Sequence, residues 1–315
     1  MKRGVVSLGE ALIDFIPKDA RNMEYIKSPG GAPANVAVGL ARLQIPSTFI
    51  GKVGDDVLGH FLQNTLATYG VNTNHMLFSK EVKTGLVFVT LDESGDRSFD
   101  FFVDPRADEF LSANELDEKH MIENKILHIG SISLIDEPVK TASKKAVEIA
   151  KQNGVLVSFD PNLRMALWGS ENQAKETIQD MLPNADILKV SEEELEFLTG
   201  ESDVGKGIQA LKKYNIPLIF VTLGPNGSVV AVQDQTTKVN AMKVQAVDTT
   251  GAGDAFVSGI LYCMHECEGA LDTITLEKAK QMAEFASVSG GLASSVKGAM
   301  TTLPDLKTIQ SHLQS

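Results

Sequence analysis

Short apolar runs recur along the chain and alternate with longer segments that have helical spacing of their apolar residues. The runs that predict buried strands are Val5–Leu8, Thr48–Val53, Ile126–Ile129, Leu156–Phe159, Ile187–Val190 and Leu218–Val221. Helical patterns lie between them and include Pro33–Leu43 and Val57–Tyr69. Strands that alternate with helices predict a parallel sheet covered by helices on both faces.

One segment departs from this alternation. Thr84–Leu91 and Arg97–Val103 flank a polar stretch that contains Gly95, and this pattern predicts a β-hairpin. A hairpin outside the strand–helix rhythm indicates a small β appendage, which we expect the segment Phe15–Ile26 to join. Such a flap could cover a substrate and exclude water. The alternative is an edge hairpin that buries its aromatic residues against the main domain.

Composition limits the classes of partner. The chain has 315 residues, of which 43% are hydrophobic, and this predicts one large domain, or one domain with an appendage. Its net charge of -12 argues against a nucleic-acid partner. The N-terminus lacks the apolar segment of a signal peptide, and no run is long enough to predict a membrane span. Cys263 and Cys267 supply no disulfide framework, so we expect a cytoplasmic protein.

The stretch Val247–Phe256 carries the strongest chemical signal. Gly251, Ala252 and Gly253 open a helix there, so their backbone N–H groups would point at an anion. Asp254 lies in the first turn and could accept the proton of a hydroxyl that attacks a bound phosphate, an effect worth roughly 10²–10⁴-fold in rate. Alternatively, Asp254 only complements the helix dipole.

Two motifs resemble the signatures of the ribokinase-like carbohydrate kinases, also called the PfkB family. Asp248–Asp254 (DTTGAGD) is similar to the C-terminal signature and Gly30–Ala37 (GGAPANVA) to the N-terminal one. The resemblance implies a single kinase domain over residues 1–315. Its fold is a Rossmann-like α/β fold, with a central, mostly parallel sheet flanked by helices. A small β-sheet lid is implied at about residues 12–28 and 84–104.

The resemblance also implies an ATP-dependent sugar kinase that requires Mg²⁺. By motif match, Asp254 is the general base and Gly251, Ala252 and Gly253 form the anion site. Family members often use a monovalent cation such as K⁺ beside this loop, and Asp248 and Thr250 match that site. Relatives often form dimers through their lids, and this implies a homodimer.

On the donor side, the loop Thr222–Gly227 looks like the nucleotide loop of the family, although Asn226-Gly227 is also a strong turn dipeptide. Glu194 matches an acidic residue tied to Mg²⁺ through water, whereas Ser191 replaces the usual Asn. Ser191 and Glu194 equally fit a plain helix capping box. The nucleotide-binding residues that the resemblance implies are Lys189, Thr222, Gly224, Gly227 and Ser287, the last where many relatives carry Asn.

On the acceptor side, the resemblance implies a set of sugar-binding residues. They come from positions that match the family, from the predicted hairpin and from the end of a strand. The implied residues are Asp14, Gly31, Asn35, Arg97, Phe99 and Arg164. These segments are most similar to fructokinases, which convert fructose and ATP to fructose 6-phosphate and ADP. 2-Keto-3-deoxygluconate kinases share many of them, and Arg97, Arg106 or Arg164 could pair with their acid substrate. A non-catalytic sugar- or nucleotide-binding regulator is a further alternative, which the intact Asp254 disfavours.

Overall fold

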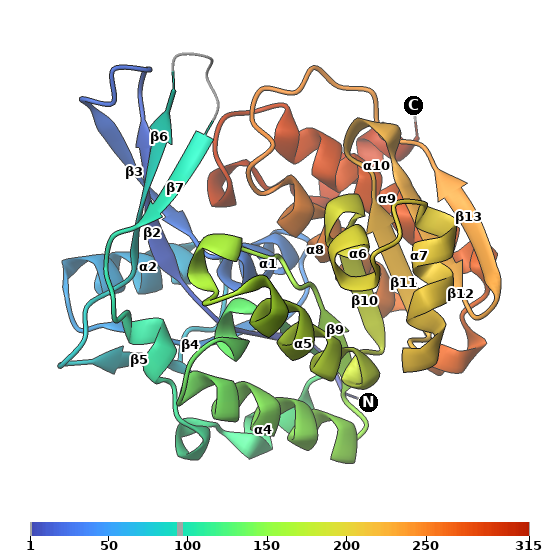
Figure 1. Ribbon diagram of the computed structural model, residues 1–315, viewed down its shortest axis with the longest axis horizontal. Helices are drawn as coiled ribbons and strands as arrows, with labels where there is room; N and C mark the ends of the chain where they lie inside the picture. The colour runs from blue at the N-terminus through green and yellow to red at the C-terminus, as the bar shows by residue number, and fades with distance from the viewer. Residues whose placement is uncertain (1, 93–96, 315) are drawn as a thin grey trace.

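The computed structural model describes residues 2–92 and 97–314, and Figure 1 shows a large sheet flanked by helices, with a smaller sheet that projects from it. The order of strands in the large sheet is β13-β12-β11-β10-β9-β8-β1-β4-β5, and the described pairs are parallel except β11–β12 and β12–β13. The strands are β1 (Val5–Leu8), β4 (Ser47–Gly54), β5 (Met76–Ser79), β8 (Ile126–Ile129), β9 (Leu156–Phe159), β10 (Ile187–Ser191), β11 (Leu218–Thr222), β12 (Ser228–Val232) and β13 (Gln235–Val239). The predicted mostly parallel sheet is confirmed.

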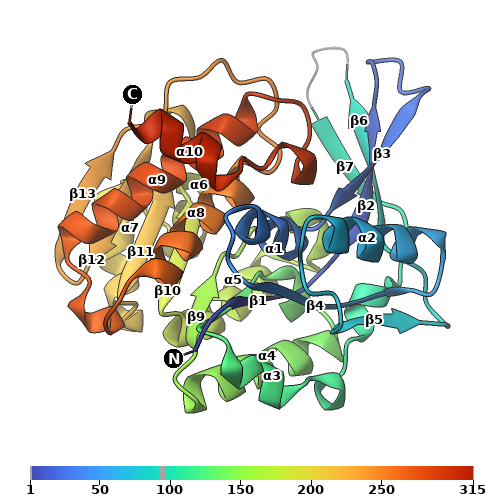
Figure 2. The same ribbon diagram turned by 180° about the vertical axis from the view of Figure 1, so that it is seen from behind.

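Helices cover both faces of this sheet. Their bounds are α1 (Ala32–Arg42), α2 (Val57–Thr68), α3 (Glu118–Glu123), α4 (Val139–Gln152), α5 (Glu171–Met181), α6 (Glu192–Thr199), α7 (Val204–Leu211), α8 (Ala252–Glu266), α9 (Leu276–Ser294) and α10 (Leu306–Leu313). Helices α4 to α7 lie in front in Figure 1, and α1, α8 and α9 lie in front in the reverse view of Figure 2. Val5 packs into the core under α1, α8 and α9, whereas its neighbour Val6 packs into the core under α4 to α7. This alternation follows from the two-residue period of a strand.

The small sheet consists of β2 (Leu12–Pro17), β3 (Tyr25–Gly30), β6 (Leu86–Leu91) and β7 (Arg97–Phe101), in the order β3-β2-β6-β7. Strands β2 and β6 run parallel, and the two outer pairs are antiparallel. The expected small second sheet is therefore present. Most of the predicted turn of its hairpin, residues 93–96, lies outside the described residues. That the sheet acts as a lid stays a prediction.

The chain passes from the small sheet to α1 through two glycines that have no room for a side chain. Gly31 has φ +101°, and a Cβ there would collide with the carbonyl oxygen of Glu10 and lie 3.0 Å from the Cα of Ala11. A Cβ at Gly30 would collide with the Asp14 carboxylate. The glycines therefore let the start of α1 approach the ends of β1 and β2. None of the helices within residues 2–92 and 97–314 combines the length and the hydropathy of a membrane-spanning segment.

Candidate active site

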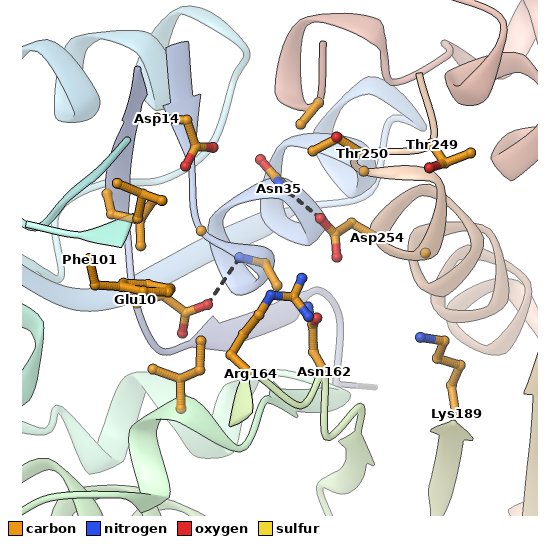
Figure 3. Close-up of a pocket in the computed structure, with 18 residues that line it drawn as sticks. Glu10, Asp14, Asn35, Phe101, Asn162, Arg164, Lys189, Thr249, Thr250 and Asp254 are labelled. Carbon is orange, nitrogen blue, oxygen red and sulfur yellow. Dashed lines mark hydrogen bonds between the residues drawn. The ribbon is translucent and has the colours of Figure 1, made fainter. Parts of the chain in front are cut away.

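A cavity of about 360 Å³ lies at the carboxyl ends of the parallel strands, next to the small sheet. Its walls come from the segment after β1, from β2 and β7, from the N-termini of α1 and α8, and from the loop after β9. In open α/β sheets, ligands bind outside the carboxyl ends of the strands. Figure 3 shows Asp14 and Glu10 on one side of this cavity, and Asp254 and Lys189 on the other.

Asp254 lines this cavity and is held there by a residue of a different helix. It lies in the first turn of α8, and its side chain is 8% exposed. The Asn35 side-chain amide donates a hydrogen bond of 2.7 Å to Asp254 Oδ2 (Figure 3). Burial raises the pKa of Asp254 to about 6; the Asn35 hydrogen bond opposes the rise, and the charge of Asp160 adds to it. Asp254 can therefore take up and release a proton near neutral pH.

The closeness of α1 and α8 explains this contact. A Cβ on Gly39 would collide with the side chain of Ser258, so the two helices pack against each other at these residues. Gly39 lies one turn after Asn35, and Ser258 lies one turn after Asp254, to whose carbonyl its hydroxyl donates at 2.7 Å. The two helix N-termini consequently meet at the cavity.

The loop before α8 is fixed by a buried carboxylate. Asp248 Oδ1 accepts the N–H of Thr250 at 2.9 Å, and Oδ2 accepts the N–H of Gly298 at 3.1 Å. Gly251 has φ +80°, and a Cβ there would lie 2.9 Å from the Cα of Ala299. Asp248 and Thr250 therefore tie the loop together in this structure. A role for them in binding K⁺ stays a prediction.

The three residues predicted to form the anion site differ in their surroundings. Gly251 and Gly253 line the cavity. Ala252 begins α8, and its N–H donates to the carbonyl of Thr249 at 3.1 Å. Two of the three positions thus face the space where an anion would bind, whereas the N–H of Ala252 is used within the loop.

Lys189, from β10, places a positive charge beside this loop. Its Nζ lies 3.1 Å from Asp160 Oδ2, and a Cβ on Gly253 would lie 3.5 Å from the same nitrogen. Burial acts to lower the pKa of Lys189, but the carboxylates of Asp160, Glu194 and Asp254 outweigh it and raise the pKa. Lys189 is therefore a fixed cation next to Gly253, and such a group can bind phosphate oxygens.

Asp14, from β2, faces Asp254 across the cavity (Figure 3). Burial raises the pKa of Asp14 to about 7; Arg164 opposes the rise, and Asp254 adds to it. The Arg164 side chain is exposed, lines the cavity, and donates a hydrogen bond of 3.1 Å to the Leu163 carbonyl. A carboxyl and a guanidinium in one small cavity can hydrogen-bond several hydroxyl groups.

Four of the six predicted acceptor residues line the cavity, and these are Asp14, Gly31, Asn35 and Arg164. The backbone of Arg97 and Phe99 belongs to β7, where they pair with Leu91 and Val89. The side chains of Arg97 and Phe99 lie outside the described part of the structure. Their neighbour Phe101 lines the cavity.

Glu194 and Ser191 form the helix capping box that the sequence predicted as one of two alternatives. The Glu194 N–H donates to Ser191 Oγ at 3.1 Å, and Glu194 Oε2 accepts the Ser191 N–H at 2.8 Å. Glu194 Oε1 accepts the N–H of Leu163 at 2.7 Å. Glu194 lines a second hollow, of about 450 Å³, that shares Arg164 and Lys189 with the first cavity. A metal role for Glu194 stays a prediction.

The remaining predicted nucleotide residues lie in neither hollow. Thr222 ends β11, and the predicted turn between antiparallel strands is confirmed, with Gly224–Asn226 forming a single 3-10 turn and Gly227 at φ +93°. Ser287 Oγ accepts the N–H of Met242 at 3.1 Å and donates to the Asn240 carbonyl at 3.2 Å. Ser287 thus anchors a neighbouring segment.

Three polar residues in or beside the cavity were not predicted as site residues from the sequence, although their positions after strands could have identified them. Glu10 closely follows β1, and Asp160 and Asn162 follow β9, so all three lie at carboxyl ends of parallel strands. Glu10 and Asn162 line the cavity, and Asp160 holds Lys189. Phe101 lines the cavity from β7, and no motif in that segment marks it as a site residue.

Comparisons with known families and proteins give matches that cover nearly the whole chain. A model of the pfkB family carbohydrate kinases matches residues 2–306. Probable fructokinase-7 of Arabidopsis thaliana is 43% identical over 322 residues, which cover 99% of this chain and 92% of that protein.

Solved structures of fructokinases are similar to this chain over nearly its whole length. Fructokinase from Vibrio cholerae O395, crystallised with fructose, ADP and a calcium ion, has a TM-score of 0.90 and 39% identity, over 98% of both chains. A double mutant of that enzyme was crystallised with fructose, ADP and a potassium ion. Fructokinase from Xylella fastidiosa with bound ATP has a TM-score of 0.92 and 32% identity, over 100% of this chain and 99% of that one.

Proposed function

Because the chain belongs to the pfkB family of carbohydrate kinases and is therefore an ATP-dependent sugar kinase, we propose that its acceptor is D-fructose. The reaction is D-fructose and ATP to fructose 6-phosphate and ADP. The observation that carries this proposal is the similarity, along nearly the whole chain, to fructokinases, one of them crystallised with fructose and ADP. The cavity supports it, because Asp14 and Asn35 present polar groups suited to sugar hydroxyls.

In the proposed reaction, Asp254 is the general base. The 6-hydroxyl of fructose gives its proton to the Asp254 carboxylate as its oxygen bonds to the γ-phosphorus of ATP. The bond between the γ-phosphorus and the oxygen that bridges to the β-phosphorus breaks, and ADP leaves. With a pKa of about 6, Asp254 is mostly ionised at pH 7 and ready to accept the proton. The hydrogen bond from Asn35 orients the carboxylate.

The negative charge of the transferring phosphoryl group needs donors and cations. We assign the N–H groups of Gly251 and Gly253, and the cation of Lys189, to this role, since all three residues line the cavity beside Asp254. Thr222, at the end of β11, Gly224 and Gly227, in the turn after it, and Ser287 are proposed to bind the rest of the nucleotide. The small sheet (12–28 and 84–104), with Arg97 and Phe99, is proposed to close over the acceptor and exclude water.

The kinase is proposed to use Mg²⁺ with its ATP. A divalent ion neutralises charge on the β- and γ-phosphates. The described residues include no cluster of three or more acidic, His or Cys side chains that could enclose a metal, and this fits an ion held mainly by phosphates and water. Both Glu194 oxygens accept backbone N–H groups and keep lone pairs for a bridging water. K⁺ is proposed to bind near Asp248 and Thr250.

The substrate assignment is tested by release of ADP with fructose, 2-keto-3-deoxygluconate, ribose, glucose and adenosine as acceptors, with and without Mg²⁺ and K⁺. We expect saturable turnover with fructose that requires Mg²⁺ and rises with K⁺. A higher kcat/KM with the keto acid would make the chain a 2-keto-3-deoxygluconate kinase instead. No turnover with any acceptor would favour a regulator that binds sugar or nucleotide without catalysis.

Replacement of the base is a second test. Asp254→Asn should lower kcat by roughly 10²–10⁴-fold, because the amide cannot accept the proton, while ATP still binds. Asp203→Asn is the matched control, since Asp203 caps α7 and lines neither hollow described above. Steady-state kinetics and calorimetric ATP titration measure both variants. Near-normal turnover of Asp254→Asn would remove Asp254 from the role of base.

A homodimer through the small sheet and a cytoplasmic location are also proposed. Phe88 stacks on Phe15 at 5.0 Å between ring centroids and contacts the ring of Phe102 edge-on at 5.5 Å, and Phe102 is 67% exposed. This aromatic group offers an apolar surface to a second copy. The two cysteines are free thiols, as expected in a reducing compartment, and cell fractionation tests that assignment.

Sedimentation velocity tests the dimer. We expect the unmodified chain to sediment as a dimer and Phe102→Asp to shift it to the monomer, because a charge would be buried in the interface. Val57→Asp is the control, since Val57 is an apolar residue at least as exposed as Phe102 (79%) but lies on α2. A monomeric unmodified chain would contradict the proposal.

A further inference from the structure

The carboxyl group of Glu10 has no function in the mechanism above, yet it lines the acceptor cavity. Glu10 comes two residues after the end of β1, and its side chain is 4% exposed. Figure 3 shows it on the same side as Asp14 and Phe101, across the cavity from Asp254. A carboxyl this deeply buried is uncommon in a protein unless it is paired or functional.

Only one of its two oxygens is paired. Oε1 accepts the backbone N–H of Ala32, at the start of α1, at 3.1 Å (Figure 3). Oε2 is buried and has no hydrogen-bond partner. Among the buried side-chain atoms without a partner in the described part of the chain, only Glu10 Oε2 and Asn35 Oδ1 belong to residues that line this cavity. A buried polar atom without a partner destabilises the folded state, unless a ligand supplies the missing bond.

The neighbouring guanidinium does not satisfy this oxygen. Arg106 Nε lies 3.3 Å from Asp108 Oδ1, and its Nη2 lies 2.9 Å from Glu109 Oε1. Burial raises the pKa of Glu10 to about 7; the charge of Asp108 adds to the rise, and that of Arg106 opposes it. The carboxyl group of Glu10 is therefore partly protonated at neutral pH, and in that form it can both donate and accept a hydrogen bond.

We propose that Glu10 is a specificity-determining residue of the acceptor site, whose Oε2 hydrogen-bonds a hydroxyl of the sugar other than the one that receives the phosphate. The inference rests on the proposed function, because it needs a polyhydroxylated acceptor in this cavity. Asp14 and Glu10 together present carboxyl groups on the wall opposite the base, and Arg106 is committed to Asp108 and Glu109.

The test combines variants of Glu10 with fructose analogues that each lack one hydroxyl. Glu10→Leu removes both polar atoms, and we expect it to raise KM for fructose by roughly 10- to 100-fold with little change in kcat. For the one deoxy analogue that lacks the hydroxyl bound by Glu10, the same substitution should leave KM nearly unchanged. Glu10→Gln keeps an acceptor for the Ala32 N–H and a polar atom at the second position, and should restore KM to within about threefold of the unmodified value.

Glu109→Gln is the matched control, because it alters the Arg106 group without touching the cavity, and its KM should stay normal. An unchanged KM in Glu10→Leu, or an equal rise for fructose and every deoxy analogue, would overturn the inference. If Glu10→Leu does not fold, Glu10→Asp, which withdraws the carboxyl group by one methylene, is measured on the same analogues. It should raise KM for fructose but not for the one analogue that lacks the bound hydroxyl, and any other pattern overturns the inference. Absence of fructose turnover by the unmodified chain would overturn the proposed function, and this inference with it.

Discussion

The site depends on one buried hydrogen bond between residues that are far apart in the sequence. Asn35 donates to Asp254 at 2.7 Å, and the two residues lie in the first turns of α1 and α8. The bond requires close helix packing, which Gly39 allows against Ser258. It also requires that α1 start against the end of β1, which Gly31 allows. The two glycine motifs of the sequence thus act together, because each positions one partner of the same contact.

The cavity concentrates carboxyl groups at a cost in stability. Burial raises the pKa of Glu10 and Asp14 to about 7 and that of Asp254 to about 6. The folded chain therefore holds these protons more tightly than the unfolded chain does. The contribution of the three protonated carboxyl groups to the free energy of unfolding is fully present below about pH 4. It is lost as the pH rises through 6 to 7 and the groups ionise. A lower stability at neutral pH is typical of a site arranged for chemistry, since a well-packed apolar core in its place would be more stable but inactive.

Much of the fold could be predicted from the sequence. Apolar runs such as Val5–Leu8 are buried on both faces, so they can be recognised as strands whatever the details of their packing. The glycines before Asp254 predict the start of a helix that can bind an anion. The hydrogen-bond partners of individual side chains could not be predicted, because they depend on which distant segments meet in the fold. Ser287 bonds to the N–H of Met242, which lies 45 residues away in the sequence, and no local sequence signal indicates this contact. Glu10 was not predicted, although its position after β1 could have identified it; that it lies opposite Asp254 depends on the order of the strands in the sheet.

In the proposed mechanism, a buried aspartate, held by Asn35, takes the proton of the acceptor hydroxyl. The pH dependence of kcat/KM for fructose tests it most directly, because this profile reports the ionisation of the free enzyme. We expect kcat/KM to fall below about pH 6, the pKa of Asp254. In Asn35→Leu the inflection should move to higher pH, since loss of the hydrogen bond raises that pKa, and this shift distinguishes Asp254 from Asp14 and Glu10. A profile that stays level between about pH 5 and 8, or an inflection that Asn35→Leu does not move, would contradict it.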